Sequence, residues 1–330
     1  MGTPDFAVPA LKKLIEAGHE VVAVVTQPDR AVGRSGELRP CPVKTCALSY
    51  DLPVLQPERI KRAEAVEELK KYPADIFVVA AFGQILSEEI LHMPKYGCIN
   101  IHASLLPKYR GAAPIQWAVI NGDETAGVTI MRMEKGLDTG DMLAVKEIAL
   151  KPKETGESLF DTLSELGAQL LIETLPGIEA GEIVPVKQDD EKSTYARMLT
   201  KEDGRIDWSK PAKEIECLIR GCNSWPSAYT GYGKKTLKIW DADVCADDTE
   251  AGNNVGTAAK SENDGGAAAE SGSNGVTVGT VISVNNDSFT VLCGGQTLLS
   301  VKEVQLEGKR RMTSGEFLRG CRIAAGESFS

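Results

Sequence analysis

Two hydrogen-bonding side chains, Asn100 and His102, close an otherwise apolar run, CINIH, over residues 98–102. In a β-strand, residues i and i+2 face the same side, so the run predicts that these two side chains project together. Open α/β sheets bind their ligands at the carboxyl ends of the strands. Asn100 and His102 are therefore candidate catalytic residues.

A third candidate is Asp138, which lies between two glycines in the segment GLDTGD, residues 136–141. A carboxylate can orient an imidazole and stabilise its positive charge, the imidazole can move a proton, and an amide can donate a hydrogen bond to a developing oxyanion. These residue types suit acyl transfer. Ser104 lacks the G-x-S-x-G frame of a nucleophile elbow, which favours direct transfer to a substrate nucleophile.

Each of these residues also has a purely structural interpretation. Asn100 and His102 could be buried polar residues that hydrogen-bond the next loop, and Asp138 could belong to a plain turn, where Gly and Asp are common. The chain has no G-x-G-x-x-G and no G-x-x-x-x-G-K-[ST] segment, so the sequence supports neither a dinucleotide fold nor a P-loop.

The first half of the chain must supply the sheet that carries these residues. Short apolar runs alternate there with helical patterns, which predicts an α/β fold with a doubly wound, mostly parallel sheet over residues 1–190. Residues 1–4 resemble the turn after a strand, and we expect that strand, about 5–6 residues, to be missing upstream of Met1. The predicted strands are 20–26, 75–83, 98–102, 127–133 and 142–150, and the predicted helices are 6–18, 60–72 and 157–175.

The second half changes in character after about residue 205. A helix over 212–222 precedes short alternating strands and a capped helix in the C-terminal tail, which predicts a small OB-like β-barrel domain over residues 211–330. Residues 191–210 are the expected linker. Residues 246–275 hold six acidic residues, one lysine and many small residues, and we expect a disordered insert there.

Composition excludes several classes of protein. The chain has 330 residues and a net charge of −10, much of it in the acidic insert, and it has no run of about 18 apolar residues. Eight scattered cysteines form no C-x-x-C pair, and no histidine stands at ligand spacing from a cysteine pair. We therefore expect a cytoplasmic monomer without a metal site, a secretory signal or a membrane partner.

Five segments together resemble the methionyl-tRNA formyltransferase family. They are GTPDFAVPAL, VTQPDRAVGR, GCINIHASLLPKYRGAAPIQWAV, GVTIMRMEKGLDTGDML and RIDWSKPAKEI, and they extend over most of the chain. The resemblance implies a folate-dependent formyltransferase domain followed by an OB-like domain that contacts tRNA. The implied reaction moves a formyl group from 10-formyltetrahydrofolate to the amino group of methionine on initiator tRNA.

The resemblance also assigns roles to residues of this chain. It implies that Asn100, His102 and Asp138 are catalytic. For the reaction it implies, our hypothesis is that Asn100 and His102 stabilise the oxyanion while Asp138 holds His102 and assists proton removal. It implies that the stretch SLLP contacts the folate and that AAFGQIL, residues 80–86, lines the pterin pocket. The implied folate-binding residues are Ser104, Leu105, Leu106, Pro107, Phe82 and Gly83.

The implied tRNA contacts lie in two regions. The loop over residues 27–40 would grip the acceptor stem, with Arg34 as the best single candidate, although Glu37 departs from the basic pattern of the family. In the C-terminal domain, basic side chains could follow the phosphates, and an ordinary solvated basic face is the alternative. These residues are Lys234, Lys235, Lys238, Lys309, Arg310 and Arg311.

Two other functions remain open on the sequence. A related formyltransferase could act on a small amine, such as glycinamide ribonucleotide or an amino-sugar nucleotide, with the same three catalytic residues. The loop over residues 27–40 favours tRNA over these substrates. A folate- or RNA-binding protein without turnover is a different class, and the intact set of Asn100, His102 and Asp138 argues against it.

Overall fold

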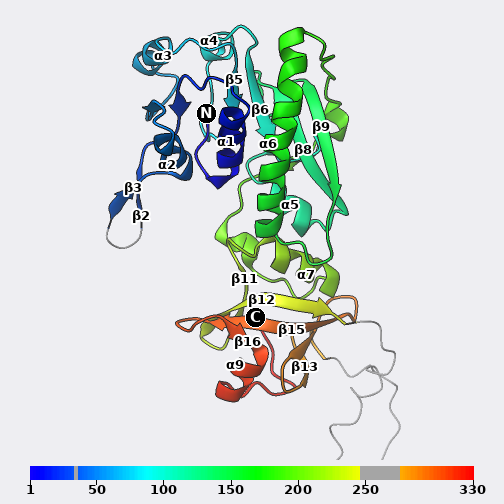
Figure 1. The fold of residues 1–330 in the computed structure, drawn as a ribbon. Helices are drawn as coiled ribbons and strands as arrows, with labels where there is room; N and C mark the ends of the chain where they lie inside the picture. The colour runs from blue at the N-terminus through cyan, green and yellow to red at the C-terminus, as the bar shows by residue number, and fades with distance from the viewer. Residues whose placement is uncertain (33–35, 246–275) are drawn as a thin grey trace, which may run out of the picture. The chain divides into compact units, whose positions relative to one another are not determined.

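The computed structural model describes residues 1–32, 36–245 and 276–330 (Figure 1). Two of our predictions, the disordered acidic insert over residues 246–275 and the tRNA contact of Arg34, concern residues outside these ranges. The chain divides into two compact units, the first made of Met1–Ala118 and Asp123–Met198, the second of Val119–Gly122 and Leu199–Ser330. The boundary at Met198 falls inside the segment 191–210 that we expected as a linker.

A central sheet organises the first unit. Its strands β5 (Phe77–Val79) and β6 (Cys98–His102) pair in parallel, whereas β6 pairs antiparallel with β8 (Thr125–Arg132), which pairs antiparallel with β9 (Met142–Ala149). Strands β1 (Val24–Val25) and β4 (Val54–Leu55) form a further parallel pair. The β6 strand has the bounds predicted from its apolar run, because burial on both faces suits that composition.

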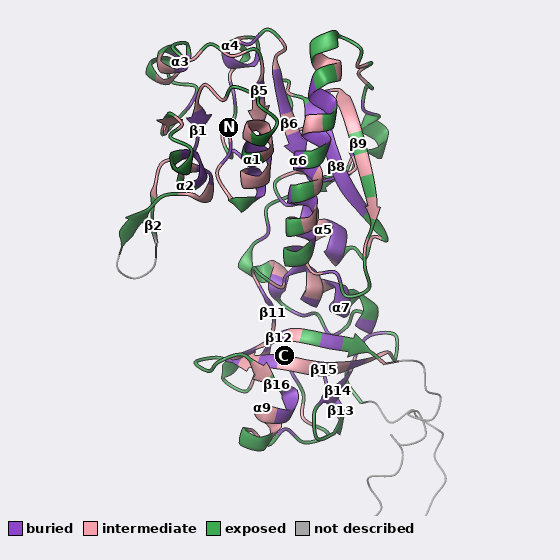
Figure 2. Ribbon diagram, in the orientation of Figure 1, coloured by how far each residue is buried: buried purple, intermediate pink, exposed green. Residues whose placement is uncertain are grey.

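Helices cover this sheet. The longest, α6 (Gly156–Ala180), starts at a capping box formed by Thr155 and Ser158. Its Gly167 lies against the sheet so closely that an added Cβ would come within 2.6 Å of the Ile101 side chain. The buried stripe of α6 faces β6 and β8 (Figure 2). The others are η1 (Asp5–Ala7), α1 (Val8–Glu16), α2 (Pro42–Ser49), α3 (Ala63–Leu69), α4 (Glu88–Leu91) and α5 (Pro114–Ile120), of which α2, α4 and α5 were not predicted.

Met1 and Gly2 take a strand position between β1 and β5. The Met1 amine donates to the Val78 carbonyl oxygen at 2.7 Å, Ala80 N donates to the Met1 carbonyl oxygen at 2.9 Å, and Gly2 N donates to the Val25 carbonyl oxygen at 3.0 Å. A cavity of about 480 Å³ with a lining of both apolar and polar residues adjoins them, and its lining segments include 19–25 and 72–78. The predicted strand 20–26 forms only at Val24–Val25, where β4 pairs with it. The expected upstream strand stays a prediction.

In a chain prepared with Met1 as its first residue, the buried Met1 amine predicts a pH dependence of stability. Burial lowers the pKa of this amine from 8.0 to about 6. Between pH 6 and 8 the unfolded chain therefore binds more protons than the folded chain, so the free energy of unfolding rises with pH across this window, by up to about 2.7 kcal/mol. Urea unfolding at pH 6, 7 and 8 measures the rise. A chain whose Met1 nitrogen is acylated has no amine to titrate, so the part of the rise in unfolding free energy that is due to this amine should be absent. An equal rise with pH in the acylated and the unmodified chain would contradict the prediction.

The second unit is built on an antiparallel sheet in the order β11 (Ala228–Tyr232), β12 (Lys235–Val244), β15 (Leu298–Leu306), β14 (Phe289–Leu292) and β13 (Val281–Val284), with β16 (Met312–Thr313) pairing with β15. Alternate residues of β12 and β15 enter one core, in which Leu237, Val301 and Phe289 are fully buried. Helices α7 (Ala212–Gly221) and α9 (Ser314–Gly320) pack on it. The predicted fold class, an α/β domain followed by a small β domain, is confirmed.

Three further observations concern the whole described chain. No helix of residues 1–32, 36–245 and 276–330 is both long and apolar enough to cross a membrane. Within the same ranges, no group of three or more His, Cys, Asp and Glu side chains is placed to hold a metal ion. All eight cysteines have free thiols.

Candidate active site

Strand β6 carries Asn100 and His102 on the sheet face opposite to α6. Ile101, between them in sequence, contacts the helix at Gly167, so strand alternation points its two neighbours the other way. His102 is buried with 5% exposure. Asn100 is half-buried, and its side-chain amide makes no hydrogen bond with any residue that the structure describes. The Asn100 amide is therefore available to a ligand.

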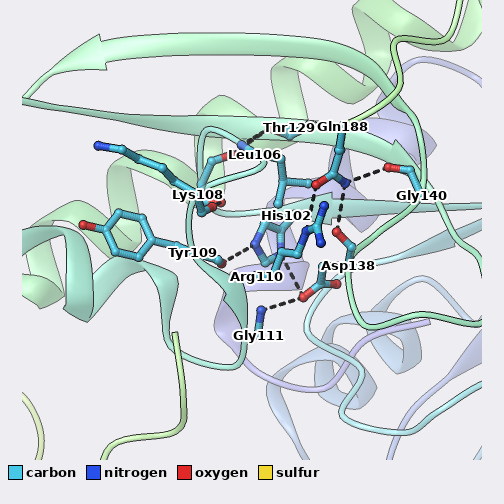
Figure 3. Close-up of polar contacts among 11 residues, drawn as sticks. His102, Leu106, Lys108, Tyr109, Arg110, Gly111, Thr129, Asp138, Gly140 and Gln188 are labelled. Carbon is cyan, nitrogen blue, oxygen red and sulfur yellow. Dashed lines mark hydrogen bonds and ion pairs between the residues drawn. The ribbon is translucent and has the colours of Figure 1, made fainter. Parts of the chain in front are cut away.

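The two nitrogens of the His102 ring have different surroundings (Figure 3). Nε2 lies 2.9 Å from the carbonyl oxygen of Tyr109, and because a carbonyl oxygen only accepts, Nε2 carries a proton. Nδ1 lies 3.7 Å from Oδ2 of Asp138. In the neutral ring Nδ1 is then the unprotonated nitrogen, and an imidazolium formed by its protonation faces a carboxylate.

The loop between β8 and β9 holds Asp138 in place. Its Oδ2 accepts a hydrogen bond from Gly111 N at 2.8 Å, and the residue has a φ of +51°, which is unfavourable for a residue with a side chain. Gly140 lies so close to the Arg132 carbonyl oxygen that an added Cβ would come within 1.9 Å of it. The loop therefore presents the carboxyl group toward His102 in a fixed conformation. The structure brings Asp138, predicted from a distant segment, to the same site as His102.

The other nucleophile types near this site are occupied or inert. Burial raises the pKa of the Cys98 thiol, on the same strand, to about 12. The Ser104 hydroxyl donates to the Lys108 carbonyl oxygen at 2.6 Å. The site therefore fits direct transfer between two substrates better than a covalent intermediate on the protein.

The stretch predicted to contact folate, residues 104–107, is fixed to β8. Thr129 Oγ1 donates to the Ser104 carbonyl oxygen at 2.7 Å and accepts from Leu106 N at 3.2 Å. Leu106 is buried, whereas Leu105 and Pro107 are half-buried. Ligand contact by this stretch stays a prediction, and the half-buried side chains are the ones able to make it.

The structure separates the roles open to Phe82 and Gly83. The Phe82 side chain, with 2% exposure, belongs to the core cluster that includes Val79 and Ile90. Its carbonyl oxygen accepts from the Gln27 side chain at 3.0 Å, so a ligand has little access to this residue. Gly83 is exposed with a φ of +77°. Of the two predicted pterin contacts, Gly83 is the accessible one.

Three residues of the site escaped the sequence analysis, and they are Tyr109, Arg110 and Gln188. Arg110 and Gly111 form the short strand β7 (Arg110–Gly111), which pairs in parallel with β10 (Tyr195–Ala196). Gln188, 50 residues after Asp138, donates to the carbonyl oxygens of Asp138 and Gly140. Its position between α6 and β10 has no periodicity or motif that marks it as part of a site.

The basic residues predicted to contact tRNA lie in both units. The expected loop 27–40 contains the antiparallel hairpin of β2 (Arg30–Val32) and β3 (Glu37–Arg39), and exposed Glu37 and Arg39 pair within it at 3.4 Å. In the second unit, Leu237 near the start of β12 pairs antiparallel with Leu306 at the end of β15. The turn that precedes β12 and the turn that follows β15 therefore lie at the same end of this strand pair. We call these exposed residues the basic edge, and they are Lys234, Lys235, Lys309, Arg310 and Arg311.

Two members of the basic edge have acidic partners. Arg310 pairs with Glu316 at 3.0 Å, and Arg311 pairs with Glu303. The Arg311 guanidinium also lies over the Trp240 ring, 4.7 Å from its centroid, and Lys238 approaches the same ring at 5.6 Å. Trp240 and Lys238 thus add an aromatic and a basic side chain beside this edge.

Family descriptions and curated proteins match nearly the whole chain. The formyl transferase family matches residues 1–175, and the formyl transferase C-terminal domain matches residues 198–322. A methionyl-tRNA formyltransferase of Lachnospira eligens is 56% identical over 326 residues, which cover 99% of this chain and 97% of that protein. One of Geobacter metallireducens is 45% identical over 326 residues, covering 99% of this chain and 96% of that protein.

Solved structures of similar fold have much lower sequence identity. WlaRD, a sugar 3N-formyl transferase crystallised in the presence of dTDP and 5-N-formyl-THF, is 18% identical with a TM-score of 0.63, covering 94% of this chain and 97% of that one. An N-formyltransferase from Helicobacter canadensis, in complex with folinic acid and dTDP-3-aminofucose, is 17% identical with the same TM-score, covering 91% and 96%. Likeness at these identities concerns the fold alone.

Proposed function

The chain belongs to the formyl transferase family, and from this premise we propose that it formylates the amino group of methionyl-initiator tRNA with 10-formyltetrahydrofolate as the donor. The curated relatives that carry the name methionyl-tRNA formyltransferase, at 45–56% identity over 99% of this chain, support that choice of acceptor. We further propose that the protein acts in the cytoplasm with these two substrates as its partners.

The observation that carries the chemistry is the arrangement of Asn100, His102 and Asp138 at the end of β6. In the proposed step the neutral amine attacks the formyl carbon, a C–N bond forms and the carbonyl oxygen becomes an oxyanion. The unengaged Asn100 amide donates to that oxyanion. His102 Nδ1 accepts the proton that the attacking nitrogen loses, while the Asp138 carboxylate, 3.7 Å away, stabilises the imidazolium.

Collapse of the intermediate completes the transfer. The bond between the formyl carbon and the donor nitrogen breaks, and His102 returns its proton to that leaving nitrogen. Because Nε2 is engaged by the Tyr109 carbonyl oxygen, we assign proton transfer to His102 Nδ1, in place of the oxyanion contact that the sequence led us to expect from His102. Half-buried Leu105 and Pro107, together with exposed Gly83, are the residues we propose for contact with the folate.

For tRNA we propose contacts from the basic edge of the second unit and from the hairpin of β2 and β3, with Arg34 in the intervening segment. Clustered lysines and arginines neutralise phosphates and release counterions, so such contacts weaken as salt rises. Lys234, Lys235 and Lys309 are exposed, which leaves their ammonium groups able to approach a phosphate backbone.

A formylation assay tests the proposed function. With 10-formyltetrahydrofolate as donor, we expect formylmethionine to form on charged initiator tRNA but not on free methionine or on a dTDP-linked amino sugar. At limiting tRNA the rate should fall steeply between 50 and 200 mM salt. Faster formylation of the amino sugar would favour the small-amine alternative, and folate binding without any product would favour a binding protein.

A further inference from the structure

Gln188 lies on the segment that follows α6, and every polar atom of its side chain is engaged beside the active site. Its Nε2 donates to the carbonyl oxygens of Asp138 at 2.9 Å and Gly140 at 2.7 Å. Its Oε1 accepts from Nε of Arg110 at 3.0 Å. The side chain is buried with 5% exposure, so water does not compete freely for these bonds.

The partners of Gln188 allow only one orientation of its amide. A guanidinium only donates and a backbone carbonyl oxygen only accepts, so the amide oxygen must face Arg110 and the amide nitrogen must face the loop. Arg110 is itself held by Asp190, whose Oδ1 accepts from its guanidinium at 2.7 Å. Arg110, held by Asp190, thus contacts Gln188, and Gln188 contacts the loop that carries Asp138. Figure 3 shows the contacts from Arg110 through Gln188 to this loop.

The loop needs such support. Asp138 has a φ of +51°, and a non-glycine residue stays in that region only when its surroundings hold it there. The two carbonyl groups that Gln188 binds are that of Asp138 itself and that of Gly140, two residues later. By fixing the peptide planes that precede Thr139 and follow Gly140, Gln188 limits rotation of the backbone that carries the Asp138 carboxyl group.

We propose that Gln188 is a positioning residue for formyl transfer, which holds the loop so that the Asp138 carboxylate faces His102 Nδ1. The inference rests on the proposed function of this site. Gln188 does not need to touch either substrate for this role. Its effect on the reaction passes through Asp138, and that dependence distinguishes it from a residue that only stabilises the fold.

Gln188→Glu is the sharpest variant. It keeps the shape of the side chain and an oxygen for Arg110, but it replaces two N–H donors by a carboxylate oxygen that faces two carbonyl oxygens. We expect kcat to fall by about 10- to 100-fold, because small misplacements of catalytic groups cost that much, with KM for the folate donor nearly unchanged. Gln188→Met removes the two N–H donors without adding a charge, and it should also lower kcat.

A double-mutant cycle with Asp138→Asn tests the dependence on Asp138. If Gln188 acts through that carboxylate, Gln188→Glu should lower kcat less than about threefold in the Asp138→Asn background, because coupled residues are not additive. Gln169→Glu is the matched control, since exposed Gln169 donates to Glu173 on α6 at 2.9 Å, away from the site. It should leave kcat unchanged in both backgrounds.

Three outcomes separate the possibilities. Equal losses of kcat in the two backgrounds would overturn the positioning role, as would a lowered melting temperature with an unchanged kcat. The Gln188→Met arm decides the result if Gln188→Glu fails to fold. An unaltered chain that formylates no methionyl-tRNA would overturn the proposed function and this inference together, whereas an active chain with additive effects overturns this inference alone.

Discussion

Asp138→Asn is expected to lower kcat for formyl transfer by about 10²- to 10⁴-fold, which is the usual contribution of a positioned acid–base group. The asparagine oxygen can still accept the Gly111 N–H bond that Oδ2 accepts at 2.8 Å, so the loop should keep its shape. The negative charge facing His102 Nδ1 is lost, and with it the stabilisation of the imidazolium. Single-turnover kinetics with bound substrates measures the chemical step directly.

A second carboxylate in the same loop provides the control for this variant. Glu134 is exposed, and Glu134→Gln removes one negative charge from the loop away from His102. We expect it to keep kcat within about twofold, consistent with the small effect of exposed charges. The folate affinity of Asp138→Asn, measured by equilibrium binding, should stay near that of the unaltered chain. A kcat within threefold of the unaltered value would show that Asp138 has no catalytic part.

His102→Gln is expected to cost about 10²- to 10⁴-fold in kcat for a complementary reason. In the unaltered chain His102 Nε2 lies 2.9 Å from the Tyr109 carbonyl oxygen. The glutamine amide nitrogen can take the place of Nε2 and donate to the same oxygen. The variant has no titratable nitrogen in the place of Nδ1, so no side-chain nitrogen there can accept the proton of the attacking amine. The substitution thus removes proton transfer while keeping the buried hydrogen bond.

His92 provides the matched control for that substitution. It is exposed at the end of α4, and its Nδ1 lies 2.7 Å from the Glu88 carbonyl oxygen. His92→Gln should leave kcat and the unfolding midpoint unchanged. If His102→Gln turned over near the rate of the unaltered chain, proton transfer would have to be assigned to another group. Thermal unfolding of the variant separates a catalytic loss from a folding defect.

The sequence was most informative where local pattern decides structure. The apolar run 98–102 predicted β6 with its observed bounds, and strand alternation correctly placed Asn100 and His102 on a shared face. The helix 212–222 and the strands on either side of GLDTGD were likewise predicted within a few residues. Hydrophobic period and turn residues specify such elements without help from distant parts of the chain.

The contacts that shape the site are of another kind. Arg110 meets Gln188 across 78 positions, and Gly111 meets Asp138 across 27. No local pattern encodes such pairings, because they arise only when the sheet brings separate segments together. The tautomer of His102 follows from a backbone carbonyl oxygen, which is the same in every residue type. Burial of Phe82 likewise depends on what packs around it and not on its own segment.

The strand pairing of β7 with β10 has a consequence for where the catalytic half of the protein can be divided. The three proposed catalytic residues are encoded before position 140, yet residues 186–196 hold their surroundings. Val186 pairs with Met142 next to the loop, and the backbone of Thr194 and Ala196 binds Arg110 and Ala112. A fragment ending at residue 175, where the first family match ends, would contain the three proposed catalytic residues and lack the segment 186–196 that contacts their surroundings. A fragment designed to keep the segments around the three residues should therefore extend to Met198, where the first compact unit ends.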